Sequence, residues 1–148
     1  LQKLAVAEAM TGSGAVLDRG LPGDRVFCKL LKQQGLIEER EWLAYERFYQ
    51  IMTCDLRPPS LIVYLDVDPR TAFDRLQARA REAEMNGGVT LDYLKALDRG
   101  YRDLIAEIES GRHVWSRGME VLRWPYNADW QILDPLVDEI KHRLRIED

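Results

Sequence analysis

The sequence predicts an α/β fold in which a central parallel sheet is covered by helices. Residues 61–65, LIVYL, form a short apolar run that is typical of a strand buried on both faces. Runs of this kind alternate with longer stretches of helical periodicity, which indicates parallel strands joined by helices. The chain of 148 residues is long enough for one modest domain, which we expect to span residues 1–148.

Composition excludes several classes of function. Hydrophobic residues make up 46% of the chain and charged residues 31%, as in an ordinary globular domain. The formal net charge of -4 argues against a nucleic-acid partner, which requires a basic surface. The chain has no apolar stretch near the ~18 residues of a membrane helix, so we predict no membrane insertion. Cys28 and Cys54 lack the close spacing of a zinc motif and suit a reducing compartment.

The N-terminal part of the chain predicts mainly helices. It opens without Met in a helical pattern, so we expect the sequence to begin inside a helix of a longer protein. Apolar spacing and turn signals predict a helix over 1–10, a strand over 15–17, and helices over 24–34 and 38–53. The last of these helices carries a stripe of large side chains that favours core packing: Trp42, Tyr45, Tyr49 and Met52.

The C-terminal part alternates between the two kinds of element. Asp68 and Pro69 predict a helix start after the apolar run, because Asp accepts hydrogen bonds from free amides and Pro suits the first turn. A helix over 90–109, a strand over 119–122, a loop over 124–130 and a helix over 134–144 follow. His113 and His142 have no acidic or cysteine partner at ligand spacing, so we expect both on the surface.

The helix that starts at Asp68 carries a series of arginines. Arg75 and Arg79 are four residues apart and share one face, and Arg81 follows them. Ligands of open α/β sheets lie beyond the carboxyl ends of the strands, and guanidiniums near that edge suit an oligophosphate. A solvent-exposed helix face that carries both arginines and acidic residues explains the same pattern. Periodicity alone favours this explanation over phosphate binding.

A second group of charged residues follows the predicted strand over 15–17. Asp18 and Arg19 come directly after it, and Asp24 opens the next helix. If this strand neighbours the one over 61–65, both charged groups converge at one edge of the sheet. Asp18 is then suited to hold Mg²⁺ or accept a hydroxyl proton, and Arg19 to neutralise a transferring phosphoryl group. An Asp–Arg pair that only stabilises the turn is an equally supported alternative.

Taken together, these segments resemble the deoxynucleoside kinase family, which includes deoxycytidine, deoxyguanosine and insect multisubstrate kinases. Asp18-Arg19-Gly20 resembles the family's Glu/Asp-Arg-Ser motif, and GDRVF over 23–27 its Ser-Asp-Arg-type stretch. GLIEEREWLAYERFY over 35–49 is similar to the family's Glu-Trp and Tyr helix. Residues 61–84 match the lid segment with its Arg-x-x-x-Arg-x-Arg-x-x-Glu pattern, and LDYLKAL over 91–97 the helix that follows the lid.

The resemblance implies a P-loop-kinase-like, three-layer α/β fold with a central parallel sheet and a helical dimer face. It implies ATP-dependent 5′-phosphorylation of deoxynucleosides for nucleotide salvage, with Mg²⁺, by a homodimer in the cytoplasm or mitochondrial matrix. Asp18 takes the acidic catalytic or Mg²⁺ role, and Arg19 bridges the 5′-hydroxyl and the phosphates. Asp24 lies against the nucleobase and Glu84 reaches the sugar 3′-hydroxyl. The residues expected on ATP are Arg75, Arg79 and Arg81 at the phosphates, and Ala128, Asp129 and Trp130 at the adenine.

Two departures from the family pattern qualify this expectation. Gly20 replaces the serine of the motif, and Thr11-Gly12-Ser13-Gly14 lacks the Lys-Ser/Thr of a P-loop. We therefore expect the P-loop and the family's following Glu upstream of Leu1, and residues 1–148 alone to be inactive. A kinase-like structural subunit, such as the accessory subunit of respiratory complex I that resembles this family, is one alternative. A nucleoside monophosphate kinase, which also combines an Asp-Arg motif with lid arginines, is another.

Overall fold

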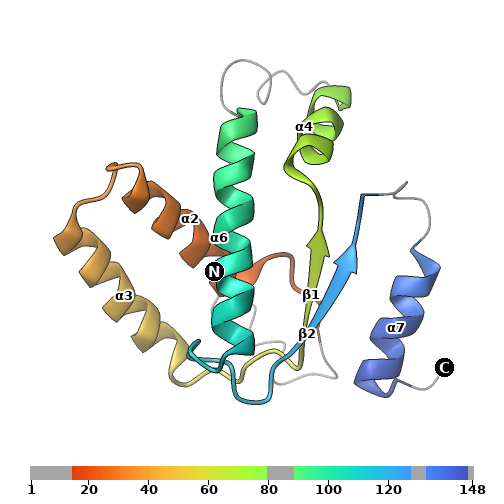
Figure 1. The fold of residues 1–148 in the computed structure, drawn as a ribbon. Coiled ribbons are helices and arrows are strands. Elements are labelled where there is room, and N and C mark those ends of the chain that lie inside the picture. Colours follow the sequence, from red (N-terminus) through yellow and green to blue (C-terminus); the bar gives the residue numbers. More distant parts are fainter. Residues whose placement is uncertain (1–14, 80–88, 128–132, 147–148) are drawn as a thin grey trace. The chain divides into compact units, whose positions relative to one another are not determined.

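The computed structural model describes residues 15–79, 89–127 and 133–146. These residues form a helix-rich α/β structure with a small parallel sheet, as predicted (Figure 1). The elements in chain order are α2 (Gly20–Gln33), α3 (Glu39–Thr53), β1 (Leu61–Asp66), α4 (Pro69–Ala78), α6 (Leu91–Glu109), β2 (Glu120–Pro125) and α7 (Asp134–Leu144).

The chain divides into two compact units. The helical unit comprises Leu1–Pro58 and Ala96–Arg117 and contains α2, α3 and most of α6. The sheet unit comprises Pro59–Lys95 and Gly118–Asp148 and contains β1, α4, the start of α6, β2 and α7. None of the helices in the described parts of the chain is both long and apolar enough to cross a membrane.

The described part of the helical unit is built around the apolar faces of α2, α3 and α6. Val26 and Leu30 of α2 are buried, as are Leu104, Ile105 and Ile108 of α6. The two helices approach closely at Gly100, where a Cβ atom would lie only 2.9 Å from Cγ1 of Val26. The bare Cα of Gly100 therefore permits the crossing of α2 and α6.

Both long helices of this unit follow the prediction closely. The predicted helices over 38–53 and 90–109 are α3 and α6. Glu38 is the N-cap of α3, and its backbone N–H donates to the Glu41 carboxylate at 2.8 Å. In the predicted stripe Tyr49 is buried, whereas Trp42, Tyr45 and Met52 are half-buried. Trp42 stacks on Tyr45 and Tyr45 on Tyr49, with ring centroids 5.8 and 6.2 Å apart.

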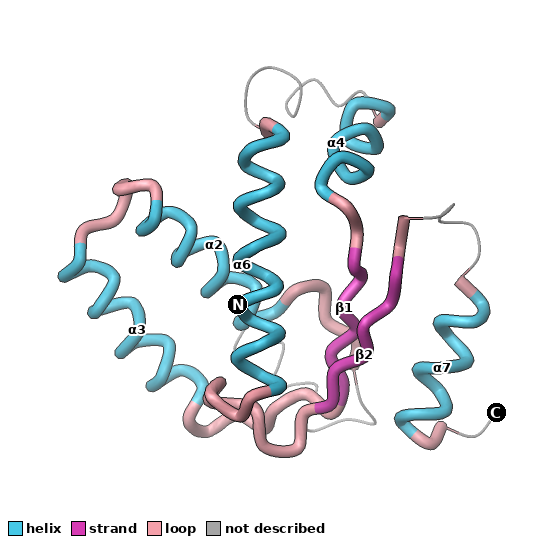
Figure 2. Tube along the Cα trace, in the orientation of Figure 1, coloured by secondary structure: helices cyan, strands magenta, loops and turns pink. Residues whose placement is uncertain are grey.

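The sheet unit has β1 and β2 paired in parallel, with Leu61 opposite Glu120 and Asp66 opposite Pro125 (Figure 2). Asp68 caps α4 as predicted, since its carboxylate accepts from the amides of Arg70 and Thr71 at 2.8 and 3.3 Å. The strand over 61–65 is confirmed, but its burial on both faces is not. Leu65 is exposed and the rest of β1 is half-buried, because the sheet among the described residues has two strands only.

Other predicted boundaries need correction. Residues 15–17 are exposed and form no strand, because the described residues offer their backbone no ladder partner. They belong to the helical unit and β1 to the sheet unit, so the predicted strand pair is not formed. The second helix begins at Gly20, before the predicted Asp24, since Pro22 is tolerated within a first turn. Trp124 and Pro125 continue β2 where a loop was predicted.

Candidate functional site

Asp18, Arg19 and Gly20 form a tight turn directly before α2. The N–H of Gly20 donates to the carbonyl oxygen of Asp18 at 2.9 Å, and Arg19 has φ 67° and ψ -65°. This is a γ-turn of the rare, strained kind with positive φ. Strained backbone at residues other than glycine gathers at functional sites, where the surrounding structure holds it in place. The side chains of Asp18 and Arg19 are exposed.

The side chain of Arg19 folds back over the first turns of α2. Its guanidinium carbon lies 5.2 Å from the ring centroid of Phe27, and that ring meets Tyr101 of α6 edge-on at 6.4 Å. A Cβ atom at Gly23 would lie 3.1 Å from Cβ of Arg19 and 3.3 Å from the hydroxyl of Tyr101. Glycine at position 23 thus leaves room for the stem of Arg19. Asp24 follows with an exposed side chain.

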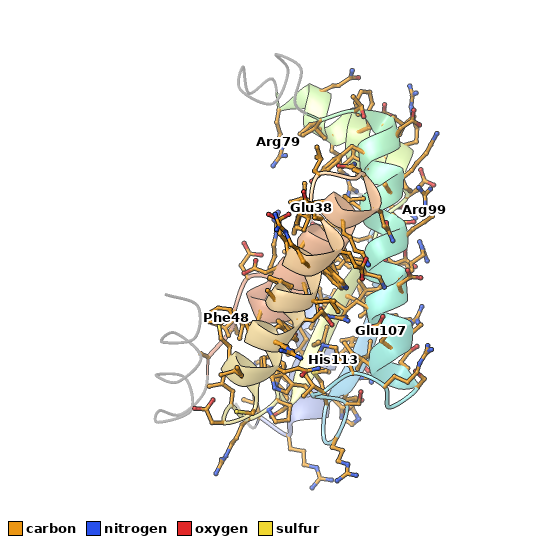
Figure 3. All side chains as sticks on the ribbon, turned by 90° about the vertical axis from the view of Figure 1, so that its left-hand side faces the viewer. Glu38, Phe48, Arg79, Arg99, Glu107 and His113 are labelled. Atoms are coloured by element: carbon orange, nitrogen blue, oxygen red, sulfur yellow. The ribbon has the colours of Figure 1, made fainter. Side chains whose placement is uncertain are left out.

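Sequence reasoning missed a charged cluster that is centred on Arg25 of α2. Nε and Nη2 of Arg25 donate to the two carboxylate oxygens of Glu46 at 2.8 and 3.1 Å. Nη1 of Arg25 donates to Glu107 at 2.8 Å, and Lys29 donates to the other oxygen of Glu107 at 3.2 Å. Figure 3 shows Glu107 on the side of α6 that meets α2 and α3. Arg25 belongs to the GDRVF motif, but its partners lie 21 and 82 residues away, so spacing gave no signal.

The opposite charges in this cluster shift the pKa values of their partners toward the charged forms. The hydrogen bond with Glu46 raises the pKa of Arg25 further above its usual range, although burial opposes the shift. Burial alone would raise the pKa of Glu107, but the hydrogen bond and charge of Arg25, helped by Lys29, lower it. Both shifts favour the charged forms of Arg25 and Glu107.

His113 is buried, so its predicted surface position is wrong, whereas His142 is exposed as expected. Figure 3 shows His113 near the end of α3. Nδ1 of His113 accepts the backbone N–H of Trp115 at 3.1 Å, and its Nε2 lies 3.3 Å from the hydroxyl of Tyr49. An accepting Nδ1 places the proton of the neutral ring on Nε2. Burial, together with the charge of Arg25, lowers the pKa of His113. Local spacing misses this site because Tyr49 is 64 residues away.

In the sheet unit, polar contacts gather where both strands end. The N–H of Asp68 donates to the side-chain oxygen of Asn127 at 2.7 Å, and that of Tyr126 to the carbonyl of Asp66 at 2.9 Å. Nη1 of Arg75 donates to the carbonyl of Tyr126 at 2.8 Å, and its guanidinium lies 5.0 Å from the ring centroid. Arg75 thus lies at the carboxyl edge of the sheet, where the arginines were expected.

The remaining predicted site residues fall into two groups. Arg79 is exposed at the C-cap of α4, and its backbone N–H donates to the carbonyl of Arg75 at 3.1 Å (Figure 3). Five others lie outside the described residues: Arg81, Glu84, Ala128, Asp129 and Trp130. Across 15–79, 89–127 and 133–146, no group of three or more His, Cys, Asp or Glu side chains is arranged to hold a metal ion. The Mg²⁺ role of Asp18 therefore remains a prediction.

Comparison with known proteins identifies the family. The family model described as deoxynucleoside kinase matches residues 2–134. The chain is 35% identical to deoxyadenosine kinase of Dictyostelium discoideum over 95 residues, which cover 64% of this chain and 38% of that protein. It is 31% identical to deoxyguanosine kinase of the same organism over 97 residues, 66% of this chain and 33% of that protein.

A third relative is named as a subunit of NADH dehydrogenase and not as a kinase. The chain is 30% identical over 92 residues to NADH dehydrogenase (ubiquinone) 1 alpha subcomplex subunit 10, mitochondrial, of Bos taurus, which is 62% of this chain and 26% of that protein. The match thus spans little more than a third, or less, of each of these three relatives. The family model nevertheless covers nearly the whole sequence, and this chain belongs to the deoxynucleoside kinase family.

Proposed function

We propose that this chain serves the ATP-dependent 5′-phosphorylation of a deoxynucleoside. One observation carries the proposal within the family: the exposed Asp18-Arg19 pair sits in a strained γ-turn at the N-terminus of α2. Backbone amides at a helix N-terminus attract anions, and a neighbouring guanidinium adds bidentate phosphate binding. A turn that only connected two segments would not need a strained arginine at this point.

In this proposal Asp18, Arg19 and Asp24 act on the acceptor, the deoxynucleoside. Phosphoryl transfer depends on positioning and on neutralising charge in the transition state. Arg19 bridges the 5′-hydroxyl and the phosphates, and Asp24 recognises the nucleobase. Asp18 accepts the hydroxyl proton or binds Mg²⁺, and one exposed carboxylate suits an ion that keeps most of its waters and also binds substrate phosphates.

Other predicted residues serve the donor, ATP: Arg75, Arg79 and Arg81 bind its phosphates, and Ala128, Asp129 and Trp130 lie at its adenine. Glu84 serves the acceptor instead, through the 3′-hydroxyl of the deoxynucleoside sugar. The position of Arg75 at the carboxyl edge of β1 and β2 supports this proposal, because ligands of parallel sheets bind beyond that edge. Salvage of nucleosides by a homodimer is the expected setting, and light scattering on the full-length protein tests the dimer.

A second candidate is a kinase-like structural subunit without turnover. The similarity to the NADH dehydrogenase subunit of Bos taurus supports it, at nearly the same identity as the similarity to deoxyguanosine kinase. In this case Asp18 and Arg19 stabilise a turn, and the exposed charges have no substrate.

Turnover of nucleosides by the full-length protein discriminates the two candidates. The four natural deoxynucleosides are incubated separately with radiolabelled ATP and Mg²⁺, and 5′-monophosphates are separated and counted. We expect phosphorylation of at least one, and a loss of kcat on the order of 10³-fold in Arg19→Ala. Absence of turnover with all four would replace the kinase proposal by the structural one. Equal loss of thermal stability and activity in Arg19→Ala would instead make the Asp–Arg pair structural.

A further inference from the structure

Arg25 joins three helices through one side chain. It lies on α2, and its guanidinium binds Glu46 of α3 through two nitrogens and Glu107 of α6 through the third. Its side chain is only 18% exposed, and the guanidinium also lies 5.9 Å from the ring centroid of Tyr49. A planar guanidinium bound on both edges has a defined orientation as well as a defined position.

This orientation determines which way the neighbouring side chains point. Successive residues of an α-helix are about 100° apart around the axis, so an Arg25 directed between α3 and α6 turns Asp24 away from them. The structure has this arrangement, with Arg25 half-buried and Asp24 exposed. Arg19 precedes the same helix in the γ-turn. A rotation of α2 would therefore displace both residues.

The beginning of α2 is held by burial of Leu21, Pro22 and Gly23 but not by capping. Among the described residues no side chain caps its N-terminus, and its first turn contains no acidic residue. The other ionic links from α2 use lysines, which act as point charges: Lys29 reaches Glu107 at 3.2 Å, and Lys32 reaches Glu39 at 2.9 Å near the other end of the helix. Apolar burial keeps this end of α2 in place but does not fix its rotation, whereas the bidentate ion pair of Arg25 does.

The cluster has more effect on geometry than on stability. Charged groups lose hydration when they are buried, and this loss offsets much of their mutual attraction. Well-packed apolar residues would often stabilise the same place equally well, but they do not impose a bidentate orientation. A cluster with this balance is expected to restrict the rotation of α2 more than it raises the free energy of unfolding.

We propose that Arg25 is a positioning residue that sets the rotation of α2 and thereby the placement of Arg19 and Asp24. The proposal rests on the proposed function for the roles of those two residues. Arg25 contacts carboxylates of its own chain, and its influence on the reaction passes through the helix that carries it.

The test variant is Arg25→Lys in the full-length protein, which keeps the charge but loses the planar fork. We expect kcat/KM for the deoxynucleoside to fall between about 10-fold and 100-fold, because small misplacements of reacting groups have effects of this size. The KM for ATP should stay close to that of the wild type. Lys32→Gln is the matched control, since it breaks an α2–α3 link far from the turn and should leave kcat/KM unchanged.

A second measurement does not depend on activity. Hydrogen exchange of the amides of Gly23, Asp24 and Phe27, which have acceptors four residues earlier, should accelerate in Arg25→Lys but not in Lys32→Gln. Glu46→Gln, which keeps the shape but weakens the fork, should show the same acceleration in smaller measure and replaces Arg25→Lys if that variant does not fold. If the wild-type protein shows no turnover, only the proposed function fails, and hydrogen exchange still tests whether the Arg25 cluster fixes the rotation of α2. The inference would be overturned if the three amides exchanged at the wild-type rate in both Arg25→Lys and Glu46→Gln. Equal acceleration in Lys32→Gln would also overturn it.

Discussion

The helical unit and the sheet unit are held together by different kinds of contact. In the helical unit most long-range polar contacts join side chain to side chain, as in the bonds of Arg25 to Glu46 and Glu107. An exception is the indole N–H of Trp115, which donates to the carbonyl of Thr53 at 3.3 Å. In the sheet unit most of them involve the main chain: the parallel ladder, the bond from the N–H of Asp68 to Asn127, and the bond from Arg75 to the carbonyl of Tyr126. The cap at Asp68 adds local bonds to the main-chain amides of α4. The helical unit thus depends on particular side chains, whereas the sheet unit depends on strand register and helix capping.

The largest expected effect on stability lies in the core of the helical unit. Ile105 is 1% exposed, so Ile105→Ala should leave a cavity and lower the free energy of unfolding by about 2–5 kcal/mol. Urea denaturation of the full-length protein measures the change. Ile51→Ala is the matched control, because Ile51 is 66% exposed in the same unit. Similar losses at both positions would show that the helical unit has no distinct core at α6.

The next effect tests whether the sheet unit handles ATP. Arg79→Ala should raise the KM for ATP more than that for the nucleoside, because each charge-assisted hydrogen bond to phosphate is worth about 1.5–3 kcal/mol. Arg70→Ala is the control, since Arg70 lies on the same helix and is paired with Asp74 at 3.1 Å. An unchanged KM for ATP together with an unchanged kcat in Arg79→Ala would remove Arg79 from the site.

A smaller effect sharpens the dependence of the sheet unit on its caps. Asp68→Ala removes the acceptor for two amides of α4 and should lower the free energy of unfolding by about 1 kcal/mol. Asp68→Asn keeps an oxygen in place and should restore most of the loss, as seen in chemical denaturation. If the asparagine variant is as unstable as the alanine variant, the charge of Asp68 matters more than its hydrogen bonds.

The smallest effect concerns pH in the helical unit. The folded pKa of His113 lies below its ordinary value of 6.5, so at pH 7 the folded ring is neutral and the unfolded ring is mostly neutral. As pH falls below 6.5 the unfolded state binds the proton first, and stability declines until the folded pKa is passed. His113→Gln should flatten this decline in thermal unfolding curves recorded between pH 7 and pH 5, whereas His142→Gln should not. A decline that survives in His113→Gln belongs to another group.

Much of the fold could be read from local pattern. The run over 61–65, the Asp68-Pro69 start and the spacing of α6 each act within a few residues, so propensity, capping and amphipathicity sufficed. The predicted strand over 15–17 failed because a strand needs a partner, and hydrophobic residues alone do not provide one. The burial of β1 was overestimated for the same reason.

The sequence by itself determined the class of fold, the position of most helices and the motif around Asp18 and Arg19, because these depend on neighbours along the chain. Only the tertiary structure decided that Arg25 binds two distant glutamates, that His113 is buried against Tyr49, and that Arg75 meets the end of β2. The partners in these contacts are separated by 21 to 82 residues, and only packing of the elements brings them within hydrogen-bond distance. Sequence spacing does not reveal such contacts, so the Arg25 cluster could be recognised only in the folded molecule.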